Sequence, residues 1–86
     1  MTPLHMAAVL NKTDIAILLM DKGAEISGAD GNGNTTLHAA VSSGNGDLIK
    51  ALLERDADKT VQNHKGQTPL DICIQNGRKD LAELLK

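Results

Sequence analysis

Three histidines and one cysteine are the side chains best suited to bind a metal ion or to act as a nucleophile: His5, His38, His64 and Cys73. A zinc ion needs ligand bonds of about 2 Å. His5 and His38 stand 33 residues apart at equivalent positions of the repeat described below, so their side chains point the same way from helices about 8–10 Å apart. We therefore expect no bound metal ion, and we expect His64 to be a solvated residue at a loop tip.

The thiol and hydroxyl groups do not form a catalytic pattern. Cys73 replaces the alanines Ala7 and Ala40 of the other repeats, which predicts a small buried hydrophobe. No histidine lies in the same repeat to activate its thiol. Ser42 and Ser43 also lack a base nearby in the sequence. We therefore predict no catalytic residue and no enzymatic activity.

The segment 28–35, with the sequence GADGNGNT, is similar to two ligand-binding loops without completing either. A phosphate-binding loop needs a lysine where Asn34 stands. An EF-hand calcium loop needs a glycine where Thr35 stands and a glutamate where Val41 stands. Because glycine and asparagine tolerate positive φ, the segment is better explained as a tight loop tip. We expect no cofactor.

The composition indicates one small unit with an aliphatic core. The 86 residues are 41% hydrophobic and 0% aromatic. No apolar run approaches the roughly 18 residues of a membrane span, so membrane insertion is not expected. A net charge of −2 without a basic cluster argues against direct nucleic-acid binding. A lone cysteine and a start unlike a secretory leader favour an intracellular location, in the cytoplasm or nucleus.

The elements that position these residues follow from an internal repeat of 33 residues. The string TPLH at 2–5 recurs as TTLH at 35–38 and as TPLD at 68–71. The same register aligns Asp14 with Asp47 and Asp80. We therefore predict a single unit over 1–86, and we divide it into repeat 1 (2–34), repeat 2 (35–67) and a partial repeat 3 (68–86).

Each repeat contains two short apolar stretches with helical spacing. In the first repeat these positions are Leu4, Ala7 and Ala8, followed by Ile15, Leu18 and Leu19. Their later counterparts are Leu37, Ala40, Val41, Leu70, Cys73 and Ile74 for the first stretch, and Leu48, Ala51, Leu52, Leu81, Leu84 and Leu85 for the second. The spacing predicts two helices per repeat, each with an apolar face. The connecting segments 23–34 and 56–67 are polar and turn-rich, which predicts hairpin-like loops.

These motifs resemble the ankyrin repeat over the whole chain. The resemblance rests on TPLH opening a short helix, on a second helix ending in Leu-Leu, and on the Gly-Ala at 23–24. It implies an all-α repeat solenoid of helix-turn-helix pairs joined by β-hairpin-like loops, with a concave side that usually binds proteins. It also implies hydrogen bonds from His5 to Thr2 and from His38 to Thr35.

Four residues depart from the ankyrin pattern. Thr36 replaces a proline, Asp71 replaces the histidine, and Asn11 and Asp56 replace glycines that normally follow the two helices. We expect each replacement to weaken one local turn without changing the fold.

Recognition is expected at positions that differ between repeats, because stacking constrains the shared ones. The resemblance places the variable positions on the inner face of the first helices and on the loops. The predicted partner-binding residues on the helices are Val9, Leu10, Ser42, Ser43, Gln75 and Asn76. Those on the loops are Ala29, Gly31, Asn32, Asn34, Gln62, His64, Lys65 and Gln67, flanked by Lys22 and Arg55.

Hydrophobicity falls along the array, from VL at 9–10 through SS at 42–43 to QN at 75–76. One interpretation is that these are the C-terminal repeats of a longer protein whose preceding repeats cover the apolar end, because terminal repeats normally have polar outer faces. The other is that Val9 and Leu10 are apolar anchors for a partner. Self-association through the apolar N-terminal end is a further expectation.

The predicted function is that of a protein–protein interaction module or adaptor. It would bind another protein through the concave face of the first helices and through the loops. The alternative is a structural spacer within a longer solenoid, with no direct binding role.

Overall fold

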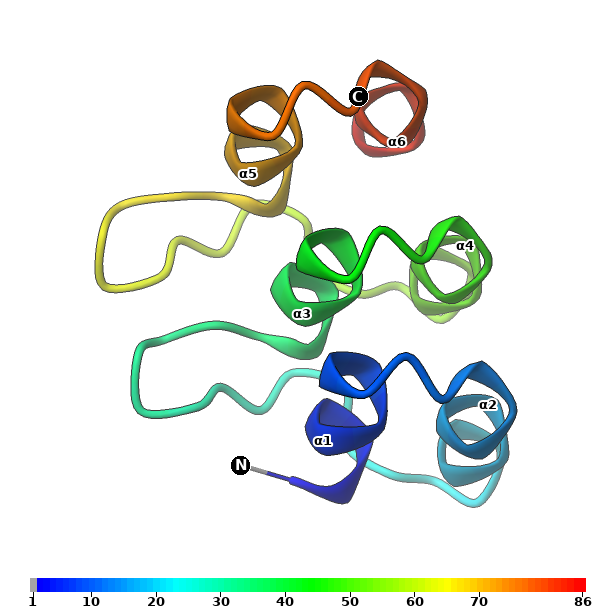
Figure 1. The fold of residues 1–86 in the computed structure, drawn as a ribbon. Coiled ribbons are helices and arrows are strands. Elements are labelled where there is room, and N and C mark those ends of the chain that lie inside the picture. Colours follow the sequence, from blue (N-terminus) through cyan, green and yellow to red (C-terminus); the bar gives the residue numbers. More distant parts are fainter. Residues whose placement is uncertain (1) are drawn as a thin grey trace.

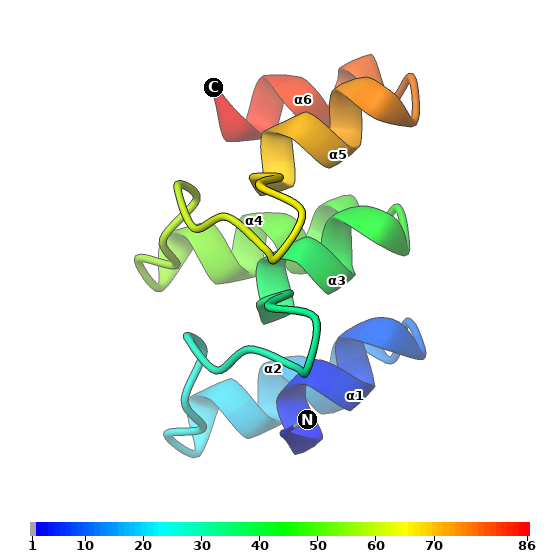
Figure 2. The same ribbon diagram turned by 90° about the vertical axis from the view of Figure 1, so that its left-hand side faces the viewer.

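The computed structural model describes residues 2–86, which form six short helices arranged as three pairs (Figure 1). One layer contains α1 (Pro3–Val9), α3 (Thr36–Ser42) and α5 (Pro69–Gln75), and the other contains α2 (Thr13–Asp21), α4 (Gly46–Glu54) and α6 (Lys79–Leu85) (Figures 1 and 2). The two long loops between pairs project beside the first layer (Figure 1). The prediction of an all-α repeat solenoid is therefore confirmed.

The long loops contain little regular β structure. The described residues form a single isolated antiparallel bridge, between Ala29 and Thr35 in the first loop, and no continuous sheet. None of the six helices is long and apolar enough to cross a membrane.

A threonine begins each helix of the first layer. Thr2, Thr35 and Thr68 have extended backbone, and each hydroxyl oxygen accepts a hydrogen bond from the backbone N–H three residues on. In return, the His38 ring accepts the N–H of Thr35, and the Asp71 carboxylate accepts the N–H of Thr68. Asp71 therefore keeps the reciprocal cap, and the expectation that it weakens this turn stays a prediction.

Charges mark both ends of the second-layer helices. Asp14, Asp47 and Asp80 lie in the first turns of α2, α4 and α6, where a carboxylate interacts favourably with the helix dipole. Lys22 and Arg55 stand at the C-caps of α2 and α4. These helices thus begin and end where the charge pattern predicts.

Two turns hold a non-glycine residue in left-handed backbone. Asn11 and Asp56 each have φ of 61°. Glycine occupies the corresponding positions in the other pairs, with φ of 70° at Gly44 and Gly77 and 89° at Gly23. A side chain at such a position meets a steric penalty that glycine avoids.

The core is aliphatic and runs through the stack between the two layers. Leu4 and Leu37 occupy equivalent positions and are each 1% exposed, and Leu48 and Leu52 of α4 are fully buried. Each helix has only seven to nine residues, which is too short for stability in water by itself. Packing of each pair on the next therefore supplies most of the stability.

The ends of the stack expose apolar side chains whose counterparts inside it are buried. Ile15 and Leu18 of α2 are each 53% exposed, whereas Leu48 of α4 is 0% exposed. Ile74 of α5 is 65% exposed, whereas Val41 of α3 is 1% exposed. The expectation of a core-facing position is thus wrong for these terminal residues, because no neighbouring pair among residues 2–86 lies on that side.

Replacing Asp56 with glycine is expected to raise the free energy of unfolding by about 0.5 kcal/mol, because glycine adopts positive φ without a Cβ clash. Urea unfolding followed by far-UV circular dichroism measures the change. The control is Lys50→Gly in the interior of α4, which should lower the free energy of unfolding by about 1 kcal/mol. Loss of stability in both variants would show that the Asp56 turn carries no such strain.

Candidate functional site

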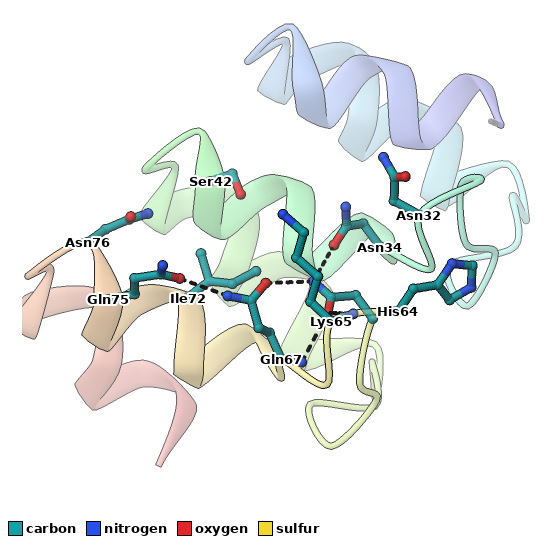
Figure 3. Close-up of a pocket in the computed structure, with 10 residues that line it drawn as sticks. Asn32, Asn34, Ser42, His64, Lys65, Gln67, Ile72, Gln75 and Asn76 are labelled. Atoms are coloured by element: carbon teal, nitrogen blue, oxygen red, sulfur yellow. Dashed lines mark hydrogen bonds between the residues drawn. The ribbon is translucent and has the colours of Figure 1, made fainter.

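Two adjoining hollows lie beside the first layer of helices, next to the projecting loops. We call the first the amide groove; it has a volume of about 400 Å³ and is lined by Asn32, Asn34, Ser42, Asn63, His64, Lys65, Gln67, Ile72, Gln75 and Asn76 (Figure 3). We call the second the His5 hollow; it has a volume of about 380 Å³ and is lined by His5, Val9, Asp30, Asn34, His38, Ala39, Ser42 and Ser43. Because Asn34 and Ser42 line both hollows, the two form one trough.

Asn63 organises the second loop from within. Asn63 is only 8% exposed, and its Oδ1 accepts the backbone N–H groups of Lys65 and Gln67 at 2.9 and 3.0 Å. Since both donors are backbone N–H groups, the oxygen must face them and Nδ2 must face away. Nδ2 donates to Oδ1 of Asn34 and to Oε1 of Gln67, at 2.9 and 3.0 Å. Asn63 therefore fixes both the loop and the orientation of two neighbouring amides.

The orientation of the Gln67 amide in turn fixes a hydrogen bond across the groove. Because Oε1 of Gln67 accepts from Asn63, Nε2 of Gln67 is free to donate to Oε1 of Gln75 on α5, at 2.8 Å (Figure 3). A chain of side-chain amides thus connects Asn34 of the first loop to Gln75, through the second loop.

His38 joins its own helix to the following loop. Its Nε2 lies 2.8 Å from the backbone oxygen of Gln67, which can only accept, so Nε2 carries a proton. Nδ1 accepts the N–H of Thr35 at 3.1 Å and lies 2.9 Å from the Thr35 hydroxyl oxygen. The expected hydrogen bond between His38 and Thr35 is therefore confirmed.

His5 does not repeat this arrangement, and the expected bond from its side chain to Thr2 is wrong. The backbone N–H of His5 donates to the Thr2 hydroxyl at 3.1 Å. The ring instead places Nε2 3.4 Å from Oδ2 of Asp30, and Nδ1 is buried with no hydrogen-bond partner among the described residues. The Asp30 carboxylate is thus the acceptor to which the His5 ring turns.

Asp30 occupies in the first loop the position equivalent to Asn63 in the second. Its Oδ1 accepts the N–H groups of Asn32 and Asn34 at 2.8 and 3.0 Å. Desolvation opposes ionisation, but these N–H groups and nearby His5 hold the pKa of Asp30 below its usual value. Burial lowers the pKa of His5, against the opposing effect of the Asp30 carboxylate. The hollow therefore combines an ionised carboxylate with a histidine that resists protonation.

His64 connects the two loops. Its backbone N–H donates to the backbone oxygen of Asn32 at 2.9 Å. Its ring lies over Gly33, where an added Cβ atom would come within 2.6 Å of the ring. Gly33 also has φ of 79°, so glycine is required there for two reasons. His64 is exposed, yet it also packs one loop on the other.

The predicted partner-binding residues fall into three groups. Those lining the amide groove are Asn32, Asn34, Ser42, His64, Lys65, Gln67, Gln75 and Asn76. Val9 and Ser43 line the His5 hollow. Those outside both hollows are Leu10, Lys22, Ala29, Gly31, Arg55 and Gln62.

Some of these residues have structural contacts that the sequence did not indicate. The hydroxyl of Ser43 donates to the backbone oxygen of Ala8 at 2.9 Å, which joins adjacent helix pairs. Arg55 pairs with Asp21 of the preceding pair. Leu10 lies on the apolar end of the stack.

Other residues line the trough although the sequence did not assign them to partner binding: His5, Asp30, His38, Ala39, Asn63 and Ile72. The alignment at 33-residue spacing contained a pattern that identifies two of them. Asp30 aligns with Asn63, and each stands two residues before an exposed loop residue whose N–H it accepts. An aspartate or asparagine at that place is typical of a side chain that closes a turn on its own backbone.

The described residues offer little further chemistry outside the trough. Residues 2–86 contain no group of three or more His, Cys, Asp or Glu side chains placed to hold a metal ion. Cys73 is fully buried, and burial raises the pKa of its thiol.

Comparison with known proteins identifies one family. The model of a family described as ankyrin repeats (3 copies) matches residues 1–63 and again residues 28–86. Together the two matches cover the whole chain. A comparison with curated protein sequences finds no match.

The protein is expected to lose stability as the pH falls below 6.5, the ordinary pKa of histidine. Because folding lowers the pKa of His5, the unfolded chain takes up a proton in this range that the folded chain does not, so acid favours unfolding. Urea midpoints at about pH 7.5 and about pH 5.5 measure the loss.

His5→Gln should lose less stability over this range than the wild-type protein. His64→Gln, which removes an exposed histidine, is the matched control and should keep the full loss. The same pH dependence in both variants would exclude His5 as the group responsible.

Proposed function

The chain belongs to the ankyrin-repeat family, whose repeats generally mediate protein–protein interaction, and from this premise we propose that it is an adaptor that binds another protein. The binding surface is the trough formed by the amide groove and the His5 hollow. The observation that carries the proposal is that eight residues that differ between repeats line a single hollow of about 400 Å³. Positions that differ between repeats thus gather on one surface.

The lining of the trough has the mixture of groups that protein interfaces use. Val9 provides an apolar side chain that is 48% exposed at the His5 end. Lys65 provides a cation in the amide groove, and Asp30 provides a carboxylate in the His5 hollow. An apolar contact beside polar and charged groups is typical of specific, reversible association.

Ankyrin repeats are typically non-catalytic binding modules. We propose that this chain is likewise not an enzyme, since its one thiol is buried. Nucleic acid is not the proposed partner, because the single lysine of the trough cannot neutralise a row of phosphates. The proposed location is the cytoplasm or nucleus, where a lone cysteine stays reduced.

We assign repeat 1 to residues 2–34, repeat 2 to 35–67 and partial repeat 3 to 68–86. The second candidate function is a spacer within a longer solenoid. A spacer would leave the trough without a bound partner, and this difference separates the two functions.

A photo-crosslinking amino acid placed at Ser42 is expected to capture a discrete partner from cell extract, because Ser42 lines both hollows. The same amino acid at Lys50, which is exposed on α4 of the other layer, is the control and should capture much less. Gel analysis of the adducts compares the two yields. Equal yields, or none at Ser42, would favour the spacer.

The N-terminal end of the stack is a second candidate interaction surface. Its exposed apolar residues are Met6, Leu10, Ile15 and Leu18, which are 50%, 59%, 53% and 53% exposed. Met6, Leu10 and Ile15 line one shallow hollow at this end, and exposed apolar side chains that lie together favour contact with another apolar surface. We propose that two copies of the chain associate through this end, each contributing the same residues.

The double variant Leu10→Ser, Leu18→Lys is therefore expected to be monomeric at concentrations where the wild-type chain is dimeric. Light scattering coupled to size-exclusion chromatography measures the mass. Ile74→Ser, which removes an exposed apolar residue from the opposite end, is the control and should remain dimeric. A monomeric wild-type chain at every concentration would rule out this association, and a monomeric Ile74→Ser variant would point to head-to-tail stacking instead.

A further inference from the structure

The amide groove presents hydrogen-bond donors whose orientation is fixed by the backbone. Two backbone N–H groups hold Oδ1 of Asn63, so Nδ2 of Asn63 must donate to Asn34 and Gln67. The side-chain oxygen of Gln75 accepts from Gln67 in turn. The oxygens of these amides are therefore occupied, whereas the NH₂ groups of Asn34 and Gln75 face away from the network (Figure 3). Rotation of any one amide would break the hydrogen bonds of its neighbours.

Lys65 adds a positive charge on the same side. Its ammonium group lies with the amide nitrogens of Asn34 and Gln75 on one side of the network (Figure 3). No aspartate or glutamate lines the amide groove. The carboxylate of the trough, Asp30, lies in the His5 hollow, where it accepts from two backbone N–H groups and faces His5.

A surface of donors and one cation is complementary to acceptors and negative charge. On a protein, such acceptors include carboxylates and those backbone carbonyl oxygens that secondary structure does not already use. Carbonyl groups within a helix are occupied by the helix itself, whereas an extended segment leaves them available.

We propose that the amide groove binds an extended acidic segment of the partner protein. A carboxylate of the segment pairs with Lys65, and its backbone carbonyl oxygens accept from the side-chain amides of Asn34 and Gln75. This inference rests on the proposed adaptor function and specifies the chemistry of the partner.

Selection from a phage-displayed library of random short peptides on the immobilised chain tests the inference. We expect the enriched peptides to be rich in aspartate and glutamate. The peptide enriched most strongly is then synthesised with a fluorescent label, and fluorescence anisotropy measures its affinity. That affinity should fall with added salt, because ions screen the pair with Lys65.

Two single substitutions remove the groups that carry the proposal. Lys65→Gln removes the charge, and Gln75→Glu exchanges an NH₂ donor for an acceptor while keeping the oxygen that Gln67 uses. Each is expected to weaken binding of the labelled peptide about tenfold, because Lys65→Gln loses a charge-assisted hydrogen bond and Gln75→Glu places an acceptor and a negative charge against the acidic segment. Lys50→Gln makes the same change of charge on α4 of the other layer and should leave affinity within about twofold.

A third variant changes Asn63, the residue that orients the neighbouring amide groups. Asn63→Asp removes Nδ2 but keeps the oxygen that closes the loop, as Asp30 does in the preceding loop. Peptide binding should weaken because Asn34 and Gln67 lose the donor that orients them. If circular dichroism shows this variant to be unfolded, the affinities of Lys65→Gln and Gln75→Glu for the labelled peptide test the inference.

The inference is overturned if no peptide is enriched, if the enriched peptides lack acidic residues, or if Lys65→Gln and Gln75→Glu bind the labelled peptide as well as the wild-type chain. The crosslinking experiment at Ser42 tests the adaptor function separately. If the enriched peptides lack acidic residues and the substitution Ser42→Arg, which fills the trough, abolishes their binding, the acidic segment is overturned and the trough remains a binding surface. Absence of crosslinking at Ser42 would overturn the adaptor function itself.

Discussion

Stacking of each helix pair on the next is the interaction on which this structure depends, because none of the six helices within residues 2–86 exceeds nine residues and none is stable by itself. The stacked surfaces are aliphatic, and Leu4 and Leu37 occupy the same place in successive pairs. Polar contacts reinforce the stacking at its edges, as where the Ser43 hydroxyl donates to the backbone oxygen of Ala8. Since each pair contacts only its neighbours, positions outside these surfaces are free to differ, and the trough consists largely of such positions.

The two loops show how one repeated backbone presents different chemistry. Asp30 and Asn63 close their loops with the same pair of hydrogen bonds to backbone N–H groups. The remaining atom of each side chain differs: Asp30 has a second oxygen, which faces His5, and Asn63 has an NH₂ group, which orients neighbouring amides. A single exchange of oxygen for nitrogen thus makes one hollow the site of a carboxylate that faces a histidine ring and the other a surface of donors.

The same stacking that forms the core also explains the exposed apolar ends. Positions such as Ile15 and Ile74 belong to surfaces that face a neighbouring pair, and Leu48 and Val41 show how completely that neighbour buries them inside the stack. At the ends of the described stack these surfaces remain apolar and open. Their hydrophobicity is therefore a consequence of the repeat pattern, and it makes the ends candidates for association.

The sequence by itself determined the repeat period, the helix pairs and the start of each first-layer helix. These features depend on interactions between residues close in the chain, such as the cap at Thr35, and on apolar spacing that any stacked neighbour satisfies. Only the tertiary structure decided that His5 turns to Asp30 and that Asn63 orients Asn34 across 29 residues of chain. Such contacts join separate repeats, and their geometry depends on how two loops lie in space, which local patterns do not encode.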